Sequence, residues 1–184
     1  MRLELQDAVE LQILPVAISL VGEGGYAALA NTTLPGSADD VFRGAYDAIS
    51  ADLMDELEDC AASASCNEER IRTSVGALVD FAAVGGPKAD LWLVAVHDAR
   101  DETRQRRRLV LDRMARLVVS GIRPTVDARE SECEIRDLFV LGGVLDRLST
   151  LRRAGDTAAI RSAEPYLVAF AIALFSAQWR ERTM

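Results

Sequence analysis

Apolar residues recur at intervals of three and four positions along most of the chain, a spacing that is typical of amphipathic helices. The clearest case is a helix predicted from Ala38 to about Cys60. Ser37 precedes this helix and is a suitable N-cap, because its hydroxyl can accept from a free backbone N–H. The apolar stripe of the helix consists of Val41, Ala45, Ile49, Leu53 and Leu57.

The same periodicity predicts further helices, which cover Leu5–Val21, Glu68 to about Val84, Asp101–Val119, about Arg129–Arg153 and about Ser162–Arg180. Gly22–Gly25 predicts the end of the first of these helices, and Asn67 is the expected cap of the second. Pro165 is expected in the first turn of the last helix. The apolar face expected for Asp101–Val119 consists of Leu109, Met114, Leu117 and Val118.

The run Leu91–Val96 is short and almost entirely apolar. It has the composition of a strand, but no other strand is predicted that could pair with it. We therefore expect a short buried helix. Aromatic residues make up only 5% of the 184 residues, and strand-forming residues do not cluster. The predicted fold class is an all-α helical bundle with a two-helix hairpin at its C-terminus.

The two C-terminal helices carry more apolar surface than a chain of this size is expected to cover alone. A helix that is apolar on most sides must be buried on most sides. Glycine inside a helix costs about 1 kcal/mol relative to alanine, and a close approach of two helices can offset that cost. We therefore predict a homodimer whose interface includes Phe139, Gly142, Gly143, Leu167, Phe170 and Leu174.

Charge and composition narrow the possible functions. The formal net charge is −8, which disfavours unaided binding to a phosphate backbone. We find no uninterrupted apolar run of about 18 residues and no leader pattern, so we predict a cytoplasmic protein without a membrane segment. Cys60, Cys66 and Cys133 lack metal-ligand spacing, which favours free thiols over a metal site; a redox-active pair of Cys60 and Cys66 is the alternative. No catalytic motif and no cofactor motif is present, so an enzyme is not expected.

Three stretches together resemble one known family. They are VGALVDFAAVGGPKADLWLVAVHDA (75–99), RRRLVLDRMARLV (106–118), and GGVLDRL followed by RRAGD and EPYLVAFAIALF (142–175). In this order they are similar to the ligand-binding and dimerisation domain of TetR-family transcriptional regulators, which end in a dimerising helix pair. The resemblance implies one such domain over residues 38–184. It also implies that residues 1–37 are the remnant of an N-terminal DNA-binding region.

The N-terminal region departs from the family. ILPVAISLVGEGGY (13–26) resembles the family's first helix, but 27–40 is too short for a helix-turn-helix and contains no Arg or Lys. Bases and phosphates in the major groove are usually read by such side chains. We therefore expect that this chain alone does not bind DNA as ordinary members of the family do.

The resemblance also indicates a ligand pocket that is mostly apolar. Its expected lining residues are Met54, Leu57, Phe81, Trp92 and His97. The alternative is that the apolar residues are plain core and that His97 caps a helix end. Arg72 or Arg113 could supply a polar anchor. Another basic group, which consists of Arg104, Arg106, Arg107 and Arg108, is expected to form a solvated, salt-bridged face.

The leading hypothesis is a homodimeric, TetR-like regulator that senses a small apolar molecule and has no working DNA-reading helix. A second hypothesis is an interaction module that dimerises with a full-length regulator and modulates it. A helical-bundle enzyme is the weakest alternative. The sequence names neither the ligand nor the promoter.

Overall fold

The computed structural model describes residues 2–119 and 130–181, and within these ranges the chain is all-α with no strand. This confirms the predicted fold class. In chain order the helices are α1 (Arg2–Ala30), α2 (Ala38–Ser63), α3 (Asn67–Val84), α4 (Gly86–Ala89), the π-helical turn η1 (Asp90–Val94), the 3₁₀ turn η2 (Ala95–His97), α5 (Asp101–Val119), α6 (Glu130–Arg153) and α7 (Thr157–Glu181).

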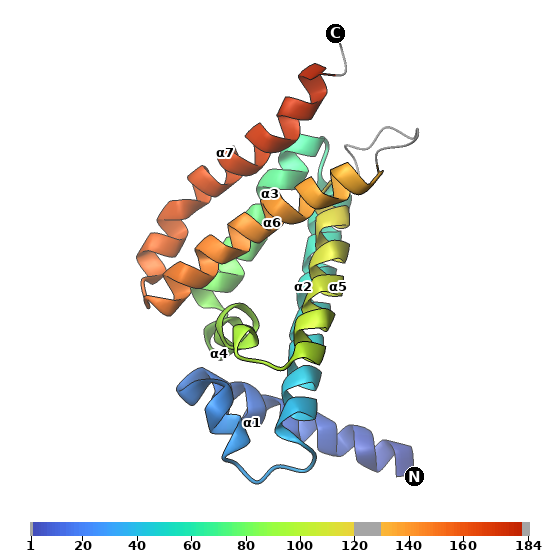
Figure 1. Ribbon diagram of the computed structural model, residues 1–184, viewed down its shortest axis with the longest axis vertical. Helices are drawn as coiled ribbons and strands as arrows, with labels where there is room; N and C mark the ends of the chain where they lie inside the picture. Colours follow the sequence, from blue (N-terminus) through green and yellow to red (C-terminus); the bar gives the residue numbers. More distant parts are fainter. Residues whose placement is uncertain (1, 120–129, 182–184) are drawn as a thin grey trace.

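The helices pack around one core, with α4, η1 and η2 between the longer ones (Figure 1). Helix α3 packs along α7, while α6 contacts α5, α3 and α7. Helices α2 and α5 lie side by side and run in the same direction (Figure 1). The register of this parallel pair is marked by the ion pairs Arg43–Glu102, Asp47–Arg106 and Glu58–Arg113, whose N···O distances are 3.1, 2.8 and 3.0 Å.

The first helix differs from the prediction. It contains Pro15 and continues to Ala30, but its direction changes at Gly24 and Gly25, whose φ angles are −142° and 67°. Gly22 is not part of this break. A Cβ on Gly22 would lie 2.6 Å from Cβ of Pro87, so this glycine lets α1 approach α4 closely. Sequence alone could not separate the two roles, because the partner of Gly22 lies 65 residues further along the chain.

The predictions for α2 and α3 are largely confirmed. All five residues of the α2 stripe are buried. The hydroxyl of Ser37 accepts from the backbone N–H of Asp40 at 3.1 Å, as an N-cap should. The cap of α3 was predicted wrongly, because Cys66 and not Asn67 occupies that position. The carboxylate of Glu69 instead accepts from the backbone N–H of Ser65, at 2.7 Å.

Two details of the later helices are also corrected. Met114 and Val118 are buried and Leu117 is partly buried, but Leu109 is 60% exposed and does not belong to the apolar face of α5. Helix α7 begins at Thr157, so Pro165 lies inside the helix and not in its first turn. The Asp156 carboxylate caps this earlier start, because it accepts from the backbone N–H of Ala159 at 2.8 Å.

Within the described residues, two stretches are long and apolar enough to cross a membrane by length and composition alone: Ile13–Ala30 and Thr157–Leu174. The second contains Arg161, which forms an ion pair with Asp80 of α3 at 3.2 Å. Core helices of soluble proteins pass the same test. The predicted cytoplasmic location therefore stays a prediction.

Candidate functional site

The indole of Trp92 is the centre of a buried aromatic group formed by η1, α2 and α3. Its exposed fraction is 0%. The ring of Phe81 meets it edge-on, and the ring of Tyr46 lies parallel to it, each with a centroid distance of 6.0 Å. The indole N–H donates to the Ser50 hydroxyl at 2.9 Å, and that hydroxyl donates to the Tyr46 carbonyl at 2.7 Å. Trp92 therefore buries its ring without leaving its N–H unsatisfied.

Tyr46 brings a polar atom into this group that has no partner. The residue is 0% exposed, and its hydroxyl has no hydrogen-bond partner in the part of the chain that the structure describes. Burial raises the pKa of Tyr46 to about 12, against the opposing effects of the Arg107 charge and the Ser50 hydroxyl. At neutral pH the hydroxyl is thus a protonated donor without an acceptor, which is an unfavourable state for a buried group.

Arg107 closes the group from α5. Its guanidinium carbon lies 5.9 Å from the Trp92 ring centroid, within the range of a cation–π contact. Its Nη1 donates to the Trp92 carbonyl at 3.3 Å. Burial lowers the pKa of Arg107, partly offset by the nearby Tyr46. No carboxylate pairs with Arg107 in the described ranges 2–119 and 130–181.

The five predicted pocket residues fall into three places. Phe81 and Trp92 are in direct contact. Met54 and Leu57 are buried core residues on the inner face of α2. His97, at the end of η2, has an exposed side chain that neighbouring residues cover in part.

The two arginines named from the sequence as possible polar anchors both form ion pairs on the surface. Arg72 is paired with Glu68 at 2.9 Å and Arg113 with Glu58 at 3.0 Å, and all four side chains are well exposed. The arginine in contact with Trp92 is Arg107, although the sequence pattern predicts it on the solvated, salt-bridged face. Its position held a usable signal: it lies four residues after buried Thr103 and seven before buried Met114, on the inner stripe of α5.

The environment of His97 allows a direct test of this arrangement. Partial burial is the main cause that lowers the pKa of His97, and the positive charges of Arg107 and Arg153 lower it further. We expect NMR titration of this single histidine to give a pKa below about 6.5, the usual value. Arg107→Gln should raise that pKa, whereas Arg108→Gln should leave it nearly unchanged. An unaltered His97 titration in Arg107→Gln would show that the guanidinium lies elsewhere.

A separate polar cluster holds the turn that carries Trp92. The Arg152 guanidinium of α6 contacts both carboxylate oxygens of Asp90, at 2.6 and 2.8 Å. It also donates to the carbonyls of Ala82 at 3.2 Å and Gly86 at 2.9 Å. The Ser149 hydroxyl donates to the Leu93 carbonyl at 2.9 Å. Helix α6 thereby supplies partners to η1, where a π-helical turn departs from the ordinary backbone pattern.

A second candidate site is the exposed apolar strip of the α6–α7 hairpin. We call it the hairpin surface, and it consists of Phe139, Gly143, Pro165, Tyr166, Ala169 and Phe170. Phe139 is 68% exposed, Tyr166 77% and Phe170 38%. A Cβ on Gly143 would lie 3.4 Å from the Phe170 ring, so this glycine accommodates the ring. Of the other residues predicted for the interface, Gly142 and Leu174 are half-buried. Leu167 is buried within the chain and belongs to its core, so its assignment to the interface is corrected.

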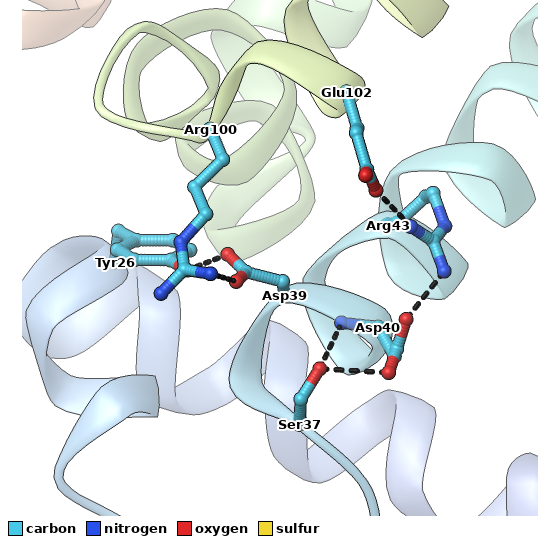
Figure 2. A network of polar contacts seen from close by, with 7 residues as sticks. All are labelled: Tyr26, Ser37, Asp39, Asp40, Arg43, Arg100 and Glu102. Carbon is cyan, nitrogen blue, oxygen red and sulfur yellow. Dashed lines mark hydrogen bonds and ion pairs between the residues drawn. The ribbon is translucent and has the colours of Figure 1, made fainter.

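The end of α1 is tied to the start of α2 and to the residue before α5 (Figure 2). The Tyr26 hydroxyl donates to the Asp39 carboxylate, which also pairs with Arg100 at 2.8 Å. The Tyr26 ring meets that of Phe42 at a centroid distance of 5.4 Å. Beside them, Arg43 of α2 bridges Asp40 and Glu102 of α5. These contacts fix α1 against the bundle at the N-terminal ends of α2 and α5.

The cysteines that can be described do not form a bond. Cys60 is half-buried and Cys66 is exposed, and both are free. Burial raises the pKa of the Cys60 thiol, and the charge of Glu56 raises it further, which disfavours the reactive thiolate. The side chain of Cys133 is not among the side chains that the structure describes. Among the described residues, no three His, Cys, Asp or Glu side chains come together as metal ligands would.

No protein-family model matches the sequence, and no curated protein is similar to it.

Proposed function

We propose that this chain is a homodimeric regulatory module of the TetR type, which binds a small molecule and does not read DNA by itself. The observation that carries the proposal is the hairpin surface. Three large apolar side chains are exposed on two helices that pack against each other, and exposed apolar surface often marks an interface.

A second copy is the occupant that fits the hairpin surface best. The opposite side of α7 is already used, because Leu167, Val168 and Ala171 are buried within the chain. Only a strip of the helix therefore needs covering. Self-complementary apolar faces that lie across a two-fold axis are the usual basis of a homodimer. Two hairpins would then form a four-helix interface, in which Gly143 lets the helices approach closely.

The absence of a DNA reader rests on the connection between α1 and α2. Only residues 31–37 separate the two helices, so this stretch contains no helix that could enter a groove. Residues 27–40 carry no Arg or Lys. The same observation favours the second candidate function, in which the chain pairs with a full-length regulator through the hairpin surface. The resulting heterodimer would carry one DNA-binding domain in place of two, and so would bind DNA less well.

The proposal is tested by measuring oligomeric state and DNA binding in one low-salt buffer. We expect light scattering to give the mass of a dimer, and labelled random and genomic DNA to remain unbound. Low salt makes the test stringent, because phosphate contacts are strongest there. A monomer would contradict the dimer. Tight binding that weakens steeply with added salt would contradict the loss of DNA reading.

A further inference from the structure

Four of the six arginines of α5 form ion pairs with carboxylates among the described residues. Arg104 pairs with Asp101 at 2.6 Å, Arg106 with Asp47 at 2.8 Å and Arg113 with Glu58 at 3.0 Å. Arg116 pairs with Asp112, and Arg108 is exposed to water. Arg107 alone combines partial burial with the lack of a carboxylate within the described residues, and Asp47, the nearest acidic neighbour along α2, is engaged by Arg106.

The contacts of Arg107 satisfy only a small part of its hydrogen-bonding capacity. A guanidinium has five N–H donors, and the Trp92 carbonyl accepts from one of its nitrogens at 3.3 Å. Moving a charge out of water without an opposite charge is unfavourable. An anion bound to the guanidinium would offset that cost, and a carboxylate matches its planar fork in a bidentate geometry.

A second unsatisfied donor belongs to a residue that contacts the same indole. The Tyr46 ring stacks on Trp92 and the Arg107 guanidinium lies over the Trp92 ring, and the charge of Arg107 also acts on the pKa of Tyr46. The Tyr46 hydroxyl is fully buried, protonated at neutral pH and without an acceptor. The group therefore offers the guanidinium donors and a hydroxyl that can also donate, and the positive charge of the guanidinium favours an anion as their partner.

The surroundings define the rest of the ligand. Beyond the two donors, the neighbouring side chains are the rings of Phe81 and Trp92 and the buried α2 residues that follow Tyr46 on the same helix face, at Ser50 and Met54. The Ser50 hydroxyl is already engaged at both ends by Trp92 and the Tyr46 carbonyl. A ligand body in contact with these residues should therefore be apolar or aromatic.

We propose that the small molecule bound by this chain is a monocarboxylate with an apolar or aromatic body, whose carboxylate is held by the Arg107 guanidinium and the Tyr46 hydroxyl. This inference rests on the ligand-binding part of the proposed function and gives its ligand a charge and a chemical class.

The test uses the emission of Trp92 in a Trp179→Phe background, where it is the only tryptophan. The probes are benzoate, hexanoate and decanoate, each compared with its neutral amide. We expect saturable emission changes with the carboxylates and at least tenfold weaker binding of the amides. Arg107→Gln should weaken carboxylate binding by about tenfold or more, and Tyr46→Phe by about three- to tenfold, as expected for charge-assisted and neutral hydrogen bonds.

Two controls separate binding from folding. Arg108→Gln removes a neighbouring exposed charge and should leave carboxylate affinity unchanged. Tyr46→Phe removes an unsatisfied buried hydroxyl and keeps the ring, so its melting temperature should not fall. If Arg107→Gln fails to fold, Arg107→Lys serves instead: it keeps the charge, loses the fork, and should retain part of the affinity.

The outcomes distinguish this inference from the proposed function. Equal binding of amides and carboxylates, with no effect of Arg107→Gln, would overturn the carboxylate assignment and leave a receptor for neutral apolar molecules. If neither the carboxylates nor the amides bind, both the carboxylate assignment and the ligand-sensing role are overturned. Dimerisation is measured separately, so this outcome does not decide it.

Discussion

A chain carrying both Phe139→Glu and Tyr166→Glu is expected to be a folded monomer where the unaltered chain is a dimer. The two side chains are 68% and 77% exposed in the single chain, so the substitutions should change the stability of the monomer by no more than about 0.5 kcal/mol. In the proposed interface they would place carboxylates on apolar surface, at a cost of several kcal/mol. Light scattering across a concentration series measures the result.

The matched control for this experiment is Leu109→Glu. Leu109 is also a large apolar residue, 60% exposed, but it lies on α5 and outside the hairpin surface. This variant should remain dimeric. Gly143→Leu tests the same surface by steric hindrance, because a side chain at this position contacts the Phe170 ring. This variant should also weaken the dimer. A double variant that stays dimeric would place the interface elsewhere.

The second large effect is expected at Arg152. Arg152→Met should lower the free energy of unfolding by about 3 kcal/mol, because it leaves the half-buried Asp90 carboxylate and the Ala82 carbonyl without their donor. It also removes one of the two donors to the Gly86 carbonyl, the other being the backbone N–H of Asp90. Urea denaturation at one fixed protein concentration measures this, since the stability of a dimer depends on concentration. In the Trp179→Phe background, the red shift of Trp92 emission should occur at correspondingly lower urea.

Arg153→Met is the control for Arg152, since its exposed side chain lies at the next position and, among the described contacts, forms no hydrogen bond with η1. Its effect on the free energy of unfolding should stay within about 0.5 kcal/mol. Asp90→Asn combined with Arg152→Met should cost less than the sum of the two single changes, because both remove one interaction. Strict additivity would mean that the contact between Asp90 and Arg152 contributes nothing to stability.

Local signals explain where the predictions from sequence succeeded. The α2 stripe and the Ser37 cap depend on residues three or four positions apart, so periodicity and cap chemistry were sufficient. The start of α7 was missed although its signal was also local. Gly155, with φ 71°, ends α6, and Asp156 caps the next helix. The predicted start at about Ser162 lies five residues after the observed start at Thr157.

The candidate site depended on contacts that a sequence does not display. Phe81 and Trp92 were predicted to line the pocket, and their rings are in contact. Apolar residues on the inner faces of packed helices are buried against one another, so such a contact can be expected from periodicity. Arg107 was assigned to solvent with its neighbours. Arg107 instead contacts Trp92 because of the register in which α5 packs on α2. In this register Arg106 forms the ion pair with Asp47, and the Arg107 guanidinium lies over the Trp92 ring.

The all-α class, most helix boundaries and the inner face of α2 could therefore be predicted from the amino-acid order, because these features follow from spacing within one helix. The amino-acid order also identified α6 and α7 as unusually apolar, but not which of their residues would remain exposed. Only the tertiary structure separated buried Leu167 from exposed Tyr166, and joined Arg152 to Asp90 across 62 residues. The physical reason is that burial and charge pairing are decided between helices, by packing that local periodicity does not specify.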